Sequence, residues 1–90
     1  MIRKGAREMR FISVGAGSVV AADRIVSAAA PDSAPLKRLV QEAKEEGSAI
    51  DLTQGKRCRS VLVLDNGMVV LSALEMDVLS QRLQTAEEEQ

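Results

Sequence analysis

The stretch that decides the fold is residues 51–72, which read DLTQGKRCRSVLVLDNGMVVLS. It begins with a basic loop, residues 54–59, and continues as two short apolar runs separated by Asn66-Gly67. Asn-Gly between two aliphatic runs predicts a two-residue type I′ turn, because both central residues of that turn need positive φ angles. The sequence therefore predicts a β-hairpin directly after a basic loop.

A two-residue turn would fix the register of this hairpin, with Leu64 opposite Val69 and Leu62 opposite Leu71. Since side chains alternate across the pleat, these four residues would share one face. The other face would carry the remaining valines, Val61, Val63 and Val70. Both faces are apolar, which is typical of strands buried on two sides. We expect one face to pack on the chain's own helices and the other on a neighbouring subunit.

Composition narrows the class of protein. Ninety residues form one domain of modest size, and Phe11 is the single aromatic residue, so the core must be aliphatic. Such a core gains stability from oligomerisation. Histidine is absent and Cys58 is the single cysteine, which removes the usual acid–base residue and metal ligands. We therefore expect no cofactor, no metal site, no catalytic residue and no enzyme activity.

Charge is distributed unevenly along the chain. The formal net charge is -1, yet residues 54–59 carry three positive charges and no negative one, while residues 87–89 are all glutamate. The near-neutral total does not exclude an anionic partner. No apolar run approaches the roughly 20 residues of a membrane span, and the N-terminus lacks the apolar segment of a signal peptide. We expect a reduced, cytoplasmic setting without a membrane partner.

Domain boundaries follow from the same patterning. Residues 1–9 hold charges and little to bury, which predicts a disordered N-terminal extension with Met9 as a candidate native start. Residues 10–84 are interpreted as a single domain. Residues 85–90 are interpreted as an acidic, flexible tail.

The N-terminal half of the domain predicts strands. Residues 10–14 and 19–22 are expected to be strands joined by a glycine turn, residues 15–18. A phosphate-binding loop is the alternative for this turn, but a third glycine and a directly following long helix are missing. Residues 24–30 favour a strand over a short helix, because Pro31 pushes the residue before it into an extended geometry.

The clearest helix follows this third strand. Asp32 or Ser33 caps it, Pro35 falls in its first turn, and Gly47 ends it. Its apolar stripe follows helical spacing: Leu36, Leu39, Val40 and Ala43. Its cations Lys37 and Arg38 are interpreted as part of a solvated face or an intersubunit pair, not as DNA contacts.

The remaining elements complete the predicted fold. Residues 48–52 are expected to form a short strand before the basic loop. A last helix is expected to begin at Glu75 or Asp77, with Leu79, Leu83 and Met76 on its inner side. The predicted class is α/β (α+β), with a small mixed sheet, a long β-hairpin, one main helix and a C-terminal helix.

The basic loop carries the chemistry that the sequence offers. Lys56, Arg57 and Arg59 place three cations in four residues, a density that can hold phosphates. The alternative is a solvated loop that keeps the hairpin edge soluble, since no aromatic residues interleave for base stacking. Cys58 is interpreted as an inert thiol, with activation by the flanking arginines as the alternative. Arg24 alone suggests only a surface ion pair with Asp23 or Asp51.

Three segments of the chain carry a family resemblance: Ala22-x-Arg24-Ile25, residues 30–38 and the Asp51-x-Thr53-x-Gly55-Lys-Arg-x-Arg59 run. Together they resemble the RemA family of bacterial regulators of extracellular-matrix genes. The Pro-Asp-Ser-Ala-Pro sequence inside the second segment is the most specific part. The resemblance extends from about residue 9 to residue 83, which is nearly the whole chain outside its two ends.

This resemblance implies a fold similar to the LytTR DNA-binding domain and a homo-oligomeric ring that binds, and bends or wraps, double-stranded DNA. Carried over by position, the DNA-binding residues would be Arg24, Lys56, Arg57 and Arg59. A nucleoid-associated transcription regulator, with control of biofilm or matrix genes, would follow. An oligomeric structural or protein-interaction module without DNA binding is the alternative.

The chain departs from the family pattern at two positions. Lys56 stands where the family usually has the first arginine of a pair, and Ala16 stands where the glycine turn usually has an aromatic residue. A simple phosphate contact survives the lysine, but a bidentate contact does not. Any role of the aromatic ring is absent from this chain.

Overall fold

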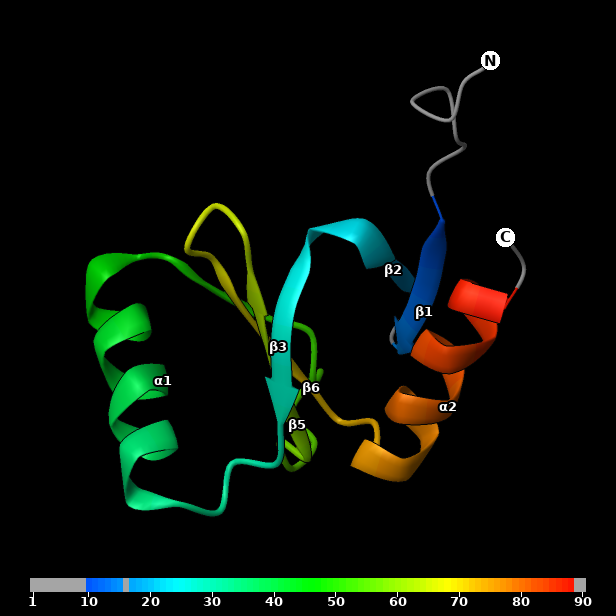
Figure 1. The fold of residues 1–90 in the computed structure, drawn as a ribbon. Coiled ribbons are helices and arrows are strands. Elements are labelled where there is room, and N and C mark those ends of the chain that lie inside the picture. The colour runs from blue at the N-terminus through cyan, green and yellow to red at the C-terminus, as the bar shows by residue number, and fades with distance from the viewer. Residues whose placement is uncertain (1–9, 16, 89–90) are drawn as a thin grey trace.

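The computed structural model describes residues 10–15 and 17–88, which form two sheets and two helices (Figure 1). The elements are β1 (Phe11–Gly15), β2 (Ser18–Ala21), β3 (Ile25–Ala29), α1 (Ala34–Glu46), β4 (Ala49–Asp51), β5 (Ser60–Leu64), β6 (Val69–Ser72) and α2 (Met76–Glu88). A short 3-10 turn, Ala22–Arg24, joins β2 to β3. The predicted α+β class with a main and a C-terminal helix is confirmed. The predicted N-terminal extension lies outside the described residues.

The four-stranded sheet has the order β3-β5-β6-β4. The predicted hairpin β5–β6 supplies its two central strands, β3 pairs antiparallel with β5, and β4 pairs parallel with β6. β1 and β2 form a separate antiparallel pair. Figure 1 shows α1 on one side of the larger sheet and the β1–β2 pair with α2 on the other. The domain is therefore layered around the hairpin on which the sequence analysis centred.

The turn of that hairpin contains three residues rather than the predicted two. The N–H of Leu64 donates to the carbonyl of Met68 (2.9 Å), and the N–H of Gly67 donates to the carbonyl of Leu64 (3.0 Å). Within the loop 65–67, positive φ occurs at Gly67 alone (87°), whereas a type I′ turn needs two such residues. The side chain of Asn66 instead accepts the N–H of Met68 (3.0 Å). The type I′ prediction at Asn66-Gly67 is therefore wrong.

The extra loop residue shifts the predicted register by one. Leu62 lies opposite Val70, and Val61 lies opposite Leu71. A one-residue shift moves every side chain of a strand to the other face of the sheet. As a result Val69 and Leu71 share the α1 side with Val61, while Val70 joins Leu62 on the opposite side.

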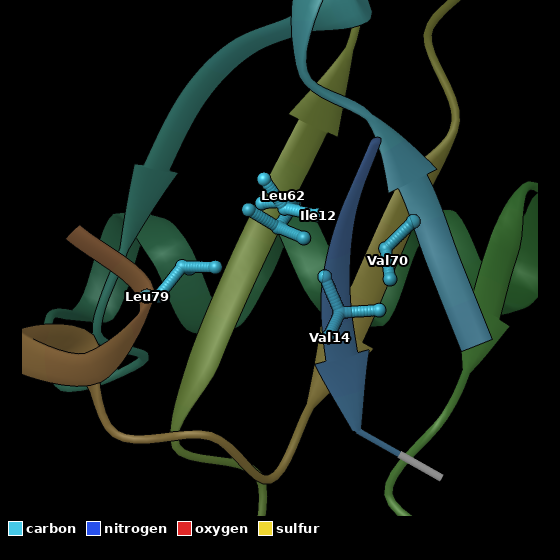
Figure 2. Packing of buried hydrophobic residues seen from close by; sticks show 5 residues of the cluster. All are labelled: Ile12, Val14, Leu62, Val70 and Leu79. Atoms are coloured by element: carbon cyan, nitrogen blue, oxygen red, sulfur yellow. The ribbon is translucent and has the colours of Figure 1, made fainter. Parts of the chain in front are cut away.

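Two apolar clusters cover the two faces of the larger sheet. The cluster beneath α1 contains Ala43, Val61, Val69 and Leu71, flanked by Leu36 and Val40 of the helix. The second cluster, on the side of β1 and α2, contains Ile12, Val14, Leu62, Val70 and Leu79 (Figure 2). Both faces are thus covered within one chain. This corrects the expectation that one face would remain open for a neighbouring subunit, because the β1–β2 pair and α2 occupy it.

The ends of α1 follow the predicted local rules. Ser33 caps the helix, its Oγ accepting the N–H of Leu36 at 3.3 Å, so Ser33 rather than Asp32 is the N-cap. Gly47 ends it in the left-handed conformation, with φ of 79°. Leu39, which was expected in the buried stripe, lies at its margin with 36% exposure. Ser33 and Gly47 therefore set the bounds of α1. Tertiary packing decides which residues of its apolar stripe are buried.

Helix α2 begins at Met76, next to the predicted start, and buries Leu79 completely. Its backbone continues to Glu88, four residues beyond the boundary predicted at residue 84. The polar composition of the last residues indicated a tail, but helix formation needs only local backbone hydrogen bonds, which polar residues also allow. The glycine turn after β1 closes an antiparallel strand pair, as its structural interpretation predicted.

Candidate nucleic-acid interface

The basic loop begins with a tight turn over Thr53–Lys56. The N–H of Lys56 donates to the carbonyl of Thr53 at 3.0 Å. Both central residues have positive φ, 55° at Gln54 and 81° at Gly55. Two consecutive residues with positive φ define the type I′ class, so this turn occurs at the entry of the basic loop and not at the hairpin tip. Glycine suits the second position because it has no Cβ to strain there.

Asp51 and Thr53 anchor this turn to the sheet. The carboxylate Oδ1 of Asp51, the last residue of β4, accepts the N–H of Thr53 (2.9 Å) and its Oγ1 hydroxyl (2.6 Å). Thr53 is buried. The hydroxyl hydrogen bond, followed by the N–H hydrogen bond, lowers the pKa of Asp51, and the positive charge of Lys44 adds to the effect. The loop thus starts from a carboxylate that is held in its charged form.

We expect Asp51→Asn to lower stability at neutral pH and to have no effect in strong acid. The folded-state pKa of Asp51 lies below its unfolded value of about 3.9. Charged Asp51 therefore stabilises the fold above that unfolded value, and the contribution is lost as the pH falls through the folded-state value. The difference should stay below about 1 kcal/mol, because Asp51 is exposed and solvent screens it.

Urea unfolding of both proteins from pH 7 to pH 2 measures this difference. The gap between the two unfolding free energies should close toward low pH. A constant gap would show that the carboxylate charge does not stabilise the turn. Glu42→Gln, which neutralises an exposed carboxylate on α1, is the matched control.

Lys56, Arg57 and Arg59 are all exposed beyond this turn. The backbone N–H of Arg59 donates to the carbonyl of Ser72 (2.8 Å), which fixes the end of the loop on β6. The guanidinium Nη1 of Arg59 lies 3.2 Å from the carboxylate of Glu75. Within residues 10–15 and 17–88, no ion pair forms on Lys56 or Arg57. Of the three cations in the basic loop, these two are therefore the more available to an incoming anion.

A groove of about 470 Å³ lies beside the loop. Its charged lining consists of three cations, Lys37, Arg57 and Arg59, and three carboxylates, Asp32, Glu75 and Asp77. The groove is therefore electrically balanced rather than basic. Cys58 also lines it, with Sγ donating to the carbonyl of Ser60 (3.4 Å) and the side chain packed on the α1 cluster. This packing fits the interpretation of Cys58 as a structural thiol.

Arg24 lies at the other end of β5. It directly precedes Ile25, which is paired with Leu64, whereas Arg59 directly precedes the first residue of β5. Arg24 lies beside Asp65, so six residue-to-residue steps of extended strand separate it from Arg59, or about 20 Å. The guanidinium Nη1 of Arg24 lies 3.1 Å from the carboxylate of Asp65, and the carbonyl of Arg24 accepts the N–H of Asp65 (2.9 Å). One protomer therefore brings three of the four predicted residues together and leaves Arg24 apart.

Sequence reasoning missed the two carboxylates that pair with these arginines. Arg24 pairs with Asp65, where Asp23 or Asp51 was expected, and Asp51 binds Thr53 instead. Glu75 was assigned only to a helix start, yet it faces Arg59. The two residues of each pair are far apart in the sequence, so no sequence motif predicts that they meet; the contact depends on how the strands pair. The Asp51-x-Thr53 spacing, by contrast, could have indicated the anchored turn.

Exposed apolar side chains border two grooves on different parts of the surface. The first, about 510 Å³ between β1 and α2, contains Phe11 (58% exposed) and Val78, and Arg82 donates to the carbonyl of Ser13 beside them (2.8 Å). The second, about 360 Å³ between β2 and β4, contains Val19 (61% exposed) and Ile50. Arg24 also lines this second groove.

Neither a metal-ligand cluster nor a helix suited to span a membrane occurs among the described residues of the chain. Among residues 10–15 and 17–88, no three His, Cys, Asp or Glu side chains gather as metal ligands. In the same residues, no helix has both the length and the apolar character needed to cross a bilayer.

Comparison with known proteins agrees with the resemblance noted from the sequence. The family model described as "RemA-like: Extracellular matrix regulatory protein A-like" matches residues 11–83. A "Putative regulatory protein" of Carboxydothermus hydrogenoformans is 42% identical over 83 residues, covering 92% of this chain and 95% of the relative. One from Bacillus cereus strain AH187 is 45% identical over 80 residues, covering 89% and 92%. The chain belongs to the RemA-like family of regulatory proteins.

Proposed function

We propose that this protein is a transcription regulator that binds double-stranded DNA as a homo-oligomeric ring, through the basic loop of each protomer. The observation that carries the proposal is the anchored turn, which presents Lys56 and Arg57 outward at the edge of a rigid sheet. Cations held in this way suit phosphates, which supply most of the affinity that does not depend on sequence. Bending or wrapping of the DNA, and control of matrix or biofilm genes, belong to the same proposal.

A ring is proposed because exposed apolar side chains lie beside two grooves with different linings. An interface between two different surfaces is heterologous, and heterologous contacts generate rings when the rotation closes. In this proposal the exposed side chains of Phe11 and Val78 form one surface of the interface, and those of Val19 and Ile50 form the other. This argument replaces the one from an open sheet face, since the protomer covers both faces itself.

Repetition around a ring also addresses the weakness of a single loop. One protomer offers few phosphate contacts, and linking many copies raises overall affinity without any new contact. Arg24 lines the second groove, so a subunit docked there would lie beside it. In a ring, Arg24 would therefore lie next to residues of the adjacent subunit.

We expect DNA affinity to fall steeply with salt and to require assembly. The logarithm of the binding constant should fall linearly with the logarithm of salt concentration, by about 0.9 for each phosphate contacted. Gel shifts from 50 to 300 mM salt, run beside light scattering, measure both properties. Val19→Asp should disperse the assembly, because it places a charge in an apolar contact, and it should weaken DNA binding in parallel.

Two results would contradict the proposal. One is a monomer that binds DNA as tightly as the unmodified protein does. The other is an assembled protein without DNA binding at 50 mM salt. Val26→Asp is the matched control, because it makes the same change at an exposed valine that lines neither groove, and it should leave assembly intact.

A protein-interaction module without DNA binding is the second candidate. It is favoured by one observation, namely that Arg24 and Arg59 each already pair with a carboxylate. Balanced charge around the groove is typical of the polar rim of a protein interface. Assembly without DNA binding in the experiment above would support this candidate.

A further inference from the structure

The two residues of the Arg59–Glu75 ion pair are each held by a backbone hydrogen bond. The backbone of Arg59 is held by its N–H on the carbonyl of Ser72 (2.8 Å). The carbonyl of Glu75 accepts the N–H of Leu79 (3.0 Å), in the first turn of α2. Leu79 is fully buried. Each partner is therefore fixed next to an ordered element, and the two side chains meet without having to order a flexible segment.

Glu75 occupies the position that a phosphate would need on this side of Arg59. The Nη1–Oε2 distance is 3.2 Å, and 46% of the Arg59 side chain and 58% of the Glu75 side chain remain exposed. Both side chains line the balanced groove with Asp32 and Asp77. An anion that approaches through this groove meets carboxylates as well as cations, so Arg59 differs from Lys56, for which the described part of the chain shows no ion pair.

We propose that Glu75 competes with DNA phosphate for Arg59 and so limits the DNA affinity of each protomer. This inference rests on the proposed function, because it concerns the same DNA-binding surface. Glu75 acts through Arg59 and has no direct role toward DNA. The result is a site in which Lys56 and Arg57 bind phosphate first, and Arg59 contributes only after it exchanges its carboxylate partner for a phosphate.

Glu75→Gln removes the negative charge while preserving the size of the side chain. We expect it to tighten DNA binding by about two- to fivefold for each engaged protomer, the range set by an exposed ion pair. The salt dependence should steepen by about 0.9 for each protomer that gains a phosphate contact. A purely structural role for Glu75 would not increase this slope, which makes the slope the decisive measurement.

Two companion variants test the specificity of the effect. Asp77→Asn makes the same charge change in the same groove without the ion pair, and it should tighten binding less than Glu75→Gln. In an Arg59→Gln background, Glu75→Gln should change neither affinity nor salt slope, because the residue through which it acts is gone. Thermal melting and light scattering establish that each variant is folded and assembled.

Any of the following results would overturn the inference. Unchanged or weaker binding by Glu75→Gln would show that Glu75 does not limit affinity. Equal tightening by Asp77→Asn, or equal tightening in the Arg59→Gln background, would show general charge repulsion instead. If the unmodified protein binds DNA and only the Glu75→Gln effect is missing, this inference alone fails. If the unmodified protein does not bind DNA at all, the proposed function fails as well.

Discussion

Replacing Lys56 and Arg57 together by alanine is expected to reduce DNA affinity on the order of 100-fold or more. Each exposed cation is available for a charge-assisted contact with phosphate, and the loss repeats in every engaged protomer. The salt dependence should become shallower by about 0.9 for each contact removed. Gel shifts and fluorescence anisotropy over the same salt series measure both effects.

The fold and the assembly should survive this double substitution. Both side chains are exposed, and neither belongs to the two apolar clusters. Arg38→Ala with Lys44→Ala is the matched control, since it removes two exposed cations from α1 and should leave affinity nearly unchanged. Equal losses in the two double variants would indicate that net charge, rather than the basic loop, controls binding. Unchanged binding without Lys56 and Arg57 would remove them from the interface.

Leu62→Ala is expected to cost about 2–5 kcal/mol in the free energy of unfolding. Leu62 lies on the central strand β5, is 0% exposed, and packs in the cluster that joins the sheet to β1 and α2 (Figure 2). Truncation leaves a cavity that the sheet cannot close without moving its strands. Urea unfolding followed by circular dichroism measures the loss.

Leu39→Ala is the control for the same chemical change at a partly exposed position. Leu39 is 36% exposed on α1, so the cost should be about 1 kcal/mol or less. Similar costs at the two positions would contradict the assignment of Leu62 to the core.

Local chemistry explains which parts of the fold the sequence predicted well. The helix bounds at Ser33 and Gly47 depend on neighbouring backbone groups, so the capping rules were sufficient. The strand before Pro31 and the glycine turn after β1 could also be predicted, because both depend on neighbouring residues. The α+β class followed from these elements together.

The errors arose where distant parts of the chain decide the outcome. A single residue in the hairpin turn changed which face of the sheet Val70 occupies, and turn chemistry at Asn66-Gly67 allows both loop lengths. The β1–β2 pair covers a face that the sequence left open, because strand order is set by tertiary packing. The partners Asp65 and Glu75 could not be predicted for the same reason.

The candidate site was predicted in part. The family resemblance implied Lys56, Arg57 and Arg59 as DNA contacts, and the structure places these three residues on one exposed loop. It gave no indication that Arg24 lies at the far end of β5. Their role as DNA contacts stays a prediction that the experiments above test.

The separation of Arg24 from the basic loop by the length of β5 sets a fixed spacing. β5 is hydrogen-bonded on both sides, by β3 and β6, so this spacing is as rigid as the sheet itself. A helical turn of DNA measures about 34–36 Å, so about 20 Å corresponds to slightly more than half a turn. A duplex that contacts Arg24 and the basic loop of the same protomer would therefore be contacted at two places slightly more than half a helical turn apart. The length of β5 would thus fix how far apart along the double helix one protomer makes its two contacts.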